Sequence, residues 1–316
     1  MKRNRYSTWI CVALLGIVSG ILHSAGTDDS VLFSPSKAAQ VDWLFVGQVV
    51  NDDQERYFYF FQMQRNGKHV AAHVALFDAE TQLPIFAEQG EALLEDLSID
   101  NWHVGHAFLR FNPINASWTF GIKESNHRGF NFKVDMLASA ENRARMQTLR
   151  PGLEVVVAQT GELDGQLQIS NADKEHFVTA KQTWFRQVAV ESSAALMTPL
   201  TGLLCQSELG GGMYAMKIMD AHALRGSMAG WLDAQGKALS ISQFININKT
   251  ADADWHLLMP VPKVDWIIKK PLQQGNIIAG FIQEQPYTGF CVLSSNLFSS
   301  PLLQAKAAGT FSRSIT

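Results

Sequence analysis

Hydrophobic and polar residues alternate along most of the chain. The alternation is clearest at residues 69–77, where every second position is apolar and the intervening ones are small or carry an imidazole. Successive side chains of a strand point to opposite faces, so this segment predicts a strand with one fully apolar face. Residues 56–64 predict its partner, and Asn66-Gly67 between them is a strong hairpin signal because both residues tolerate positive φ.

Further segments of the same kind follow at intervals of about 8–12 residues, a spacing that predicts an all-β sandwich or barrel. A small and polar stretch with a proline interrupts the series at 190–201, after which strand patterns resume and a second hairpin turn is predicted at Asp233–Gly236. A short helix is allowed at 138–148. The chain therefore predicts two β domains of comparable size, at residues 36–190 and 191–300.

Composition indicates a folded chain with a large core. Of the 316 residues, 47% are hydrophobic and 17% are charged, a balance that excludes global disorder. The formal net charge is −3 and no cluster of Lys and Arg lies beyond the N-terminus, so we expect no nucleic-acid partner. The 19 Phe, 8 Trp and 5 Tyr residues are sufficient to line a cavity for a ligand.

The first 26 residues have the pattern of a secretory signal. Cationic side chains at the start precede an uncharged apolar run at residues 8–22, and a small and polar stretch follows. We expect cleavage near Ser24–Gly26 and export to the periplasm or outside the cell. The apolar run is shorter than the ~20 residues of a spanning helix, which favours a cleaved signal. An uncleaved membrane anchor is the alternative, and it is the only membrane contact expected.

Cys205 and Cys291 are the cysteines of the expected mature chain. They could form one disulfide in an exported protein, and two buried free thiols are the alternative.

No zinc spacing occurs, and the side chains of His103 and His106 diverge in a strand-like context, so we expect no metal and no cofactor. Three glycines at 210–212 lack the lysine and helix of a phosphate loop and predict a mobile hairpin.

His73 is the polar residue of greatest interest within a predicted strand. It lies on the face opposite the apolar positions, and Asp78 ends the same strand. A histidine within a strand is commonly structural. In a barrel, however, that face can line a cavity, where a neutral imidazole can act as an acid or base or can donate a hydrogen bond to a ligand. The residues alone leave both roles open.

The segment VDWLFVGQVV at residues 41–50 resembles the EWWYFTGHL entry motif of the AttH/CrtC family, two-domain lipocalin-like proteins related to carotenoid hydratases. Three further segments resemble family motifs in the family's order, so the resemblance covers about residues 40–295. The matching residues are Trp43, Phe45 and Gly47 in the entry motif, His73, Ala75, Leu76 and Asp78 in an HxALxD strand, Val178 and Trp184 in a VxGxxWxDxxW strand, and Trp255 and Pro260 in a late WxxxxP strand.

The resemblance implies an all-β fold of two lipocalin-like antiparallel β-barrels packed together, with a cavity for a hydrophobic small molecule. Barrels of about eight strands leave room for one small ligand. The resemblance also implies cofactor-free hydratase, isomerase or cyclase chemistry on an apolar substrate. Such chemistry needs a carboxylic acid that an apolar pocket keeps protonated, so that it can donate a proton to a C=C bond.

Two departures from the family pattern bear on that chemistry. Arg186 stands where family members often have Asp, and Ala189 stands where they have a second Trp. With Arg186 in that place, the acid must come from Asp78 or Glu284, with His73 as a further acid or base. Otherwise the chemistry is lost.

A ligand site is expected on the face of the strand that carries Trp184. Arg186 lies two residues on and shares that face, and we expect both to border a cavity with His73, with Trp43 at its closed end. A buried arginine is costly unless it is paired, so a carboxylate should lie beside Arg186. The candidates are Asp42, Asp78, Glu284 and the carboxylate of an acidic ligand such as a fatty acid.

The sequence leaves two functions open. The first is an exported lipocalin-like binder or carrier of a hydrophobic small molecule or lipid, without chemistry, which the altered strand at Trp184 favours. The second is a cofactor-free hydratase, isomerase or cyclase of the carotenoid hydratase type, which the resemblance implies. A structural envelope protein with a filled core is a further alternative. Whether the protein is an enzyme, and its oligomeric state, stay open at this stage.

Overall fold

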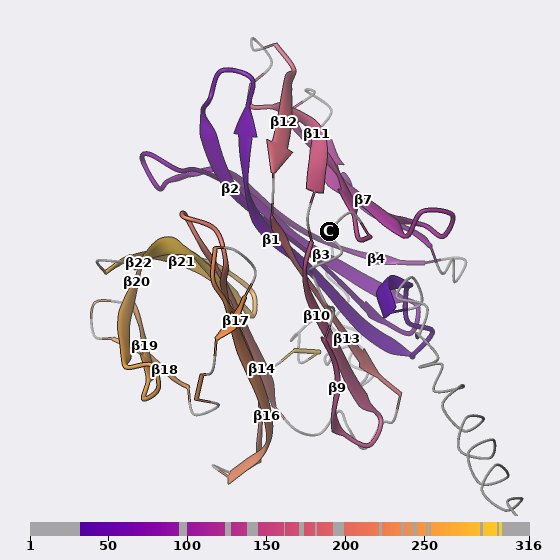
Figure 1. The fold of residues 1–316 in the computed structure, drawn as a ribbon. Coiled ribbons are helices and arrows are strands. Elements are labelled where there is room, and N and C mark those ends of the chain that lie inside the picture. Colours follow the sequence, from indigo (N-terminus) through magenta and orange to yellow (C-terminus); the bar gives the residue numbers. More distant parts are fainter. Residues whose placement is uncertain are drawn as a thin grey trace, which may run out of the picture.

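Two curled antiparallel β-sheets make up the structure, which is a computed structural model (Figure 1). It describes residues 32–94, 100–123, 128–137, 145–160, 162–170, 174–180, 182–191, 199–220, 223–234, 237–239, 241–242, 245–250, 252, 254–284, 287–295 and 297–298. The expected signal or anchor at residues 1–26 lies outside this part of the chain. Within the described ranges no helix is long and apolar enough to cross a membrane. The predicted all-β class is confirmed, as are two barrel-like sheets.

The first sheet holds thirteen strands among the described residues. They are β1 (Gln40–Asn51), β2 (Arg56–Asn66), β3 (His69–Asp78), β4 (Pro84–Leu93), β5 (Asn101–Val104), β6 (Ala107–Asn112), β7 (Ser117–Lys123), β8 (Gly129–Asp135), β9 (Arg145–Arg150), β10 (Leu153–Thr160), β11 (Glu162–Gln168), β12 (His176–Ala180) and β13 (Thr183–Val190). On one edge β1 pairs with β2; on the other it pairs first with β13 and then with β12. The sheet therefore divides at β1 into a branch that runs through β12, β11, β8, β7 and β6 to β5, and a branch of β13, β10 and β9.

The interior of the first sheet is filled with aromatic side chains. The longer branch curls back until β5 lies against β4 and encloses this interior. Trp43, Trp102 and Trp118 are fully buried there, with ring centroids 4.5, 6.1 and 6.2 Å apart. Phe45 stacks on Phe120 with the centroids 4.2 Å apart. Because aromatic pairs at such distances add about 0.5–1.5 kcal/mol each to the gain from burial, this interior is a tightly packed core.

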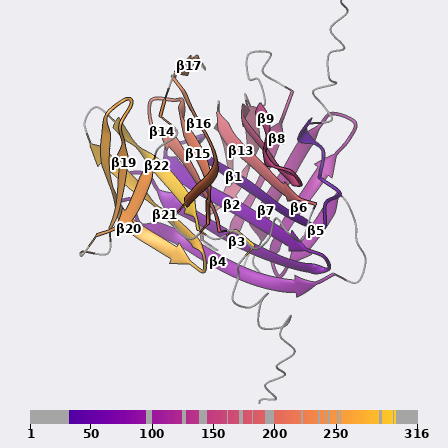
Figure 2. The same ribbon diagram turned by 90° about the horizontal axis from the view of Figure 1, so that it is seen from below.

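The second sheet forms a separate curl beside the first (Figure 2). Its order is β17, β16, β15, β14, β22, β21, β20, β19 and β18. The strands are β14 (Leu200–Ser207), β15 (Gly212–Asp220), β16 (Ala223–Leu232), β17 (Ala238–Leu239), β18 (Asn246–Lys249), β19 (Trp255–Met259), β20 (Val264–Gln274), β21 (Ile277–Glu284) and β22 (Tyr287–Ser294). Apolar residues such as Met213, Leu257 and Trp266 gather inside the curl.

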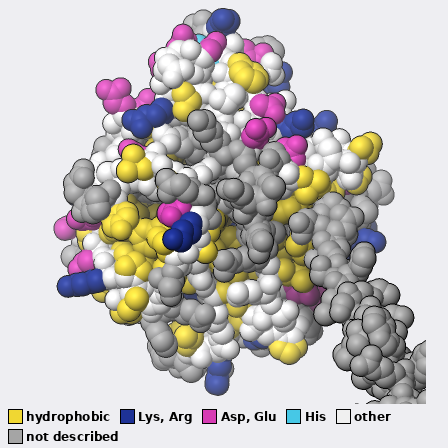
Figure 3. All heavy atoms as spheres, in the orientation of Figure 1, with side chains coloured by type: hydrophobic (Ala, Val, Ile, Leu, Met, Phe, Trp, Pro, Cys, Tyr) yellow, Lys and Arg dark blue, Asp and Glu magenta, His cyan; other side chains and the backbone are white. Residues whose placement is uncertain are grey.

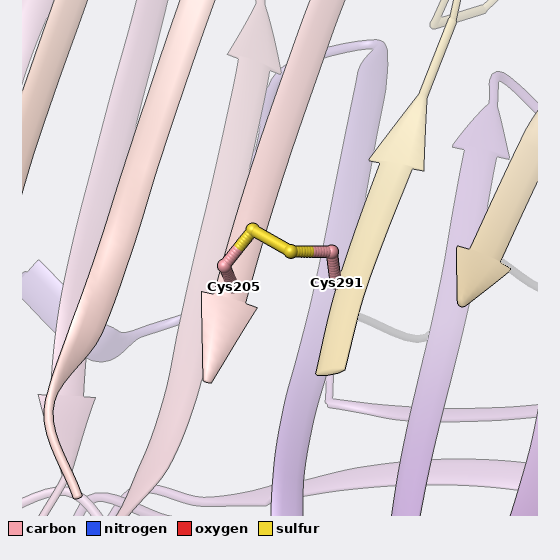
Figure 4. The surroundings of a disulfide bond; sticks show 2 residues. All are labelled: Cys205 and Cys291. Atoms are coloured by element: carbon pink, nitrogen blue, oxygen red, sulfur yellow. A yellow bond between two sulfur atoms is a disulfide. The ribbon is translucent and has the colours of Figure 1, made fainter. Parts of the chain in front are cut away.

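A disulfide joins Cys205 of β14 to Cys291 of β22 (Figure 4). The two residues are directly opposite in the paired strands, and their Cα atoms lie 4.1 Å apart. The sequence left this bond open because spacing along the chain does not show which strands become neighbours. The bond closes a loop with a sequence separation of 86 residues. On the chain-entropy account a loop of that length contributes about 4.5 kcal/mol to the free energy of unfolding.

The two sheets pack against each other through the faces that lie outside their interiors. In β1, Trp43 points into the first interior and its neighbour Leu44 points toward the second sheet. Phe58 of β2 lies against Phe281 and Phe290 of the second sheet, with ring centroids 5.6 and 5.4 Å apart. Strand β1 is therefore buried on both faces, which explains why its sequence is apolar at consecutive positions.

The hairpin predicted at Asn66-Gly67 forms, with its turn one residue further on. Asn66 pairs with His69, so the turn residues are Gly67 and Lys68. Gly67 has φ +58, whereas Asn66 and Lys68 do not have positive φ. This is the pattern of a turn with glycine at its first central position. Asn66 does not use its tolerance of positive φ, because the strand register includes that residue.

The short helix that the sequence allowed at 138–148 does not form at residues 145–148, which lie in β9 and pair with β10. The remainder of that segment lies outside the described residues. Pairing with a neighbouring strand here overrides the local preference. Residues 235 and 236 of the predicted second turn also lie outside the described residues, and β16 and β17 on either side of it are paired. The first sheet ends at Val190 and the second begins at Leu200.

Candidate functional site

A buried ion pair between Asp42 of β1 and Arg186 of β13 lies where the two sheets meet. Both side chains are 0% exposed, and Arg186 Nη2 donates to Asp42 Oδ2 at 2.7 Å. The other carboxylate oxygen accepts hydrogen bonds from the side-chain amides of Gln62 and Gln64 in β2. The carboxylate thus has three donors, as a charge needs when it is removed from water.

The guanidinium of Arg186 reaches across to the second sheet. Nη2 also donates to Ser294 Oγ of β22 at 3.2 Å, and Nη1 lies 3.9 Å from the sulfur of Met216 in β15. Gly202 of β14 leaves the room for this group, since a Cβ atom there would lie 2.3 Å from Arg186 Nη1. One side chain of the first sheet therefore contacts three strands of the second.

The prediction of a carboxylate beside Arg186 is confirmed, and Asp42 supplies it. Asp42 precedes Trp43 in β1, and the register places it opposite Val188, which lies two residues from Arg186 in β13. Because Asp42 balances the charge, Arg186 does not require an acidic ligand such as a fatty acid. The expectation that the pair has a ligand-binding role stays a prediction.

His73 of β3 lies in the same row of paired residues as Arg186, with Leu44 and Gln62 between them. Directly paired residues share a face, so His73 points toward the second sheet. Its ring packs under the β20–β21 turn, where a Cβ atom on Gly275 would lie 3.3 Å from His73 Cε1. Burial lowers the pKa of His73 to about 4, although the charge of Asp42 acts to raise it. The imidazole is therefore neutral at pH 7, and its buried Nδ1 has no hydrogen-bond partner.

The two tryptophans expected at this site lie on opposite faces. Trp184 shares the face of Arg186 and packs against Tyr214 of β15, with ring centroids 6.0 Å apart. Trp43 lies inside the first sheet, where its Nε1 donates to Gln187 Oε1 at 2.7 Å. The expectation that Trp43 closes a cavity shared with Arg186 is wrong, because adjacent positions of β1 point to opposite faces.

The two carboxylates expected as acids lie at strand ends. Asp78 Oδ1 accepts the backbone N–H groups of Glu80 and Thr81 at 3.1 and 2.6 Å, so it caps the turn after β3. Asp78 lies five residues after His73, a separation of roughly 17 Å at about 3.4 Å per residue. Glu284 ends β21, paired with Tyr287. The structure thus places His73 on the face that carries the ion pair, with Gln62 between it and β1, and places Asp78 at the end of β3.

A pocket of about 340 Å³, here called the second-sheet pocket, opens at one end of the curl of the second sheet. Trp231, Trp266 and Tyr287 form an aromatic wall, with ring centroids 5.3 to 5.6 Å apart. Met213 and the disulfide residue Cys205 also line it. Figure 3 shows hydrophobic side chains gathered within the outline of this sheet. The lining is therefore suited to an apolar or aromatic molecule.

The second-sheet pocket could not be predicted from the sequence. Trp231 and Trp266 each fall in a predicted strand, but they come together because the sheet curls between β16 and β20. Local alternation does not show this order of strands. Among the described residues that line the pocket, Asp233 is the one with a charge, and its Oδ1 accepts the backbone N–H of Lys237. Proton transfer therefore has few candidate groups there.

One group in the described part of the chain has the residue types and closeness of a metal site: Asp52, Asp53 and His176. His176 Nδ1 lies 3.0 Å from Asp52 Oδ1 and 3.3 Å from Asp53 Oδ2. The hydrogen bond from His176 lowers the pKa of Asp52. Both aspartates are exposed, so the contacts are those of a surface ion pair. His103 and His106, which lie three residues apart in the chain, are both exposed, and His106 faces Glu88.

Solved structures share this fold. A candidate AttH from Nitrosomonas europaea has a TM-score of 0.55 at 12% identity, covering 81% of this chain and 92% of that one. Kievitone hydratase from Nectria haematococca has a TM-score of 0.53 at 11% identity, with 81% and 88% covered. No protein-family model matches the chain, and a search of curated proteins finds no match. The resemblance to lipocalin-like AttH/CrtC proteins seen in the sequence is thus confirmed for the fold.

Replacing Arg186 by Met should lower the free energy of unfolding by about 3–5 kcal/mol, because Asp42 is left buried without its opposite charge. Urea denaturation measures this loss. The double variant Asp42→Asn, Arg186→Met removes both charges and should recover a large part of it. Equal losses in the single and double variants would show that the ion pair is not what the single change disrupts.

His73 should make stability depend on pH between about 6.5 and 4. The folded state holds the imidazole neutral down to a pKa of about 4, whereas the unfolded chain takes up a proton near pH 6.5. The unfolded state therefore binds more protons in this window. Stability falls as pH drops, by at most about 1.4 kcal/mol per pH unit for one proton. In His73→Gln, denaturation curves across this window should show a smaller slope; an unchanged slope would assign it to other groups.

Proposed function

We propose that this protein binds a hydrophobic small molecule in the second-sheet pocket and does not transform it. The pocket carries the proposal, since its aromatic wall of Trp231, Trp266 and Tyr287 encloses about 340 Å³. That volume falls within the about 300–1,000 Å³ of small-molecule sites. An indole or phenol ring offers a large apolar surface that loses little conformational entropy on binding.

The interior of the first sheet differs from that of the second in a way that supports the proposal. Its interior is occupied by its own aromatic rings, among them Trp43, Trp118 and Phe120, which are fully buried. A ligand could enter only by displacing packed side chains, and interiors at this density resist such changes. Among the described residues, a pocket with room for a guest molecule therefore lies in the second curl.

The alternative is a cofactor-free hydratase, isomerase or cyclase, which the shared fold of kievitone hydratase favours. In that function His73, Asp78 and Glu284 remain the candidate acids and bases. The surroundings of Asp78 and of the buried Asp42 favour binding without chemistry. Asp78 caps its own turn, and Asp42 is held by Arg186 and two amides. His73 is the group best placed for proton transfer, with a neutral ring and a buried, unpaired Nδ1.

Export is part of the proposal. Residues 1–26 have the order of a secretory signal. The disulfide between Cys205 and Cys291 adds support, because disulfides form and persist in oxidising compartments. The protein then works in the periplasm or outside the cell. A membrane anchor at residues 8–22 is the alternative.

N-terminal sequencing of the protein recovered from its natural source tests export. The mature chain should begin after residue 22 and should be found outside the cytoplasm. Retention of Met1 in a membrane fraction would favour the anchor. Retention of Met1 on a protein in the cytosolic fraction would contradict both forms of the proposal.

Native mass spectrometry of the gently purified protein tests binding. We expect an apolar molecule to be retained at one per chain, and the variant Trp231→Ala to weaken its retention at least about tenfold, because a buried aromatic contact is worth about 2 kcal/mol or more. The matched control is Phe177→Ala, which truncates an exposed aromatic side chain of the first sheet. Equal loss in both variants, or no loss in Trp231→Ala, would place the ligand elsewhere.

A further inference from the structure

A second concave region of about 480 Å³ lies between the two sheets, next to the second-sheet pocket. It is called the amide cleft here because five of its lining side chains are amides. These five are Gln48, Asn51, Gln54 and Gln182 from the first sheet and Gln206 from the second. The cleft thus joins a polar surface to the edge of an apolar pocket.

Two buried amide atoms in the amide cleft, one on each of two glutamines, have no hydrogen-bond partner. Gln206 is 3% exposed; its Nε2 donates to the carbonyl of Ser207 at 3.0 Å, whereas its Oε1 is unpaired. Gln48 has a buried and unpaired Nε2. The cleft therefore presents one buried acceptor and one buried donor. Hydroxyl groups can donate to the first and accept from the second, whereas an ammonium can only donate and a carboxylate can only accept.

The charges around the amide cleft favour a neutral guest. No Lys or Arg is among the described residues that line it. Glu208 is its one carboxylate, and Glu208 Oε2 lies 3.9 Å from Arg56 Nη1, which partly balances its charge. An anionic group would meet this carboxylate and would find no cation in the lining.

A thin wall separates the amide cleft from the second-sheet pocket. Leu209 and Gly210 of the β14–β15 turn line both spaces, as does Ala234 after β16. Gln182 of the first sheet holds this wall: its Oε1 accepts the N–H of Gly211 at 2.7 Å, and its Nε2 donates to the carbonyl of Ala234 at 3.4 Å. The side chain of Leu209 at the tip of the turn is 79% exposed.

The three glycines of this turn, expected to form a mobile hairpin, are required by its close packing. Gly210, Gly211 and Gly212 all have positive φ. A Cβ atom on Gly211 would lie 2.4 Å from the carbonyl oxygen of Leu232, and one on Gly212 would lie 2.0 Å from that of Cys205. The wall between the amide cleft and the second-sheet pocket can therefore be as thin as one turn. A molecule that passes over Leu209 at the tip of this turn reaches both the cleft and the pocket.

We propose that the ligand is amphipathic: its apolar part occupies the second-sheet pocket, and a neutral, hydroxyl-bearing head group crosses Leu209 into the amide cleft. The apolar half rests on the proposed function, and the head group rests on the cleft. Alkyl or aryl glycosides and polyol ethers have this chemistry. Gln206 and Gln48 recognise the hydroxyl groups, and Trp231 and Trp266 hold the apolar part.

The probes for this proposal are three compounds with the same eight-carbon chain. Octyl β-D-glucoside has a neutral hydroxylated head, nonanoate an anionic head on the same octyl chain, and octyltrimethylammonium a cationic head. Each is titrated into the mature protein below its critical micelle concentration, with binding followed by calorimetry and by tryptophan fluorescence. We expect the glucoside to bind at least about tenfold more tightly than either charged compound.

Two variants localise the preference. Gln206→Leu and Gln48→Leu keep the approximate size of the side chain and remove its hydrogen bonds, and each should reduce the preference for the glucoside about fivefold or more. Binding of the charged compounds should change little. The matched control is Gln166→Leu, an exposed position in β11 away from the cleft. Using two variants keeps the test valid if Gln206→Leu, at a buried position, does not fold.

The outcomes separate the two proposals. Binding of all three compounds with similar affinity, weakened by Trp231→Ala, would overturn the head-group proposal and leave the apolar pocket in place. Tightest binding of octyltrimethylammonium would assign the cleft to a cation facing Glu208 and also overturn it. A glucoside preference unchanged in both amide variants would do the same. No binding of any compound would overturn the proposed function together with this inference.

Discussion

The ion pair between Asp42 and Arg186 constrains how the two sheets meet. Both charges are fully buried, so each needs its partner at hydrogen-bond distance. A slip of one residue between β1 and β13 would turn one of the two side chains to the other face. The remaining charge would then be buried without its partner. Gly202 and Ser294 of the second sheet complete the arrangement, the first by leaving space and the second by accepting a hydrogen bond. The pair thus fixes strand register and sheet placement together.

Because the ion pair fixes how the two sheets meet, the interiors of the two sheets can be packed differently. The first interior is packed with aromatic rings and is stable through its own contacts. The second leaves a pocket and so forgoes some of that packing. Its disulfide lies at the pocket wall, where Cys205 is a lining residue. The covalent bond between β14 and β22 holds paired strands together beside the pocket, where side-chain packing is incomplete.

The sequence predicted what depends on local alternation and on the cost of burial. It predicted the all-β class, the strands around Gly67, the shared face of His73 and Arg186, and a carboxylate beside Arg186. It did not distinguish Asp42 from Asp78, because that choice depends on the register between strands far apart in the chain. It placed Trp43 wrongly, since β1 is buried on both faces and its apolar residues do not show which way each points.

The wall between pocket and cleft depends on the same sheet placement. Gln182 belongs to the first sheet, yet it holds Gly211 and Ala234, which belong to turns of the second. Hydrogen bonds of 2.7 and 3.4 Å tolerate little relative movement of their ends. The register that seats Arg186 against Gly202 therefore also sets where Gln182 meets the glycine turn. Through this connection, a buried charge pair that does not line either space helps to determine the shape of both.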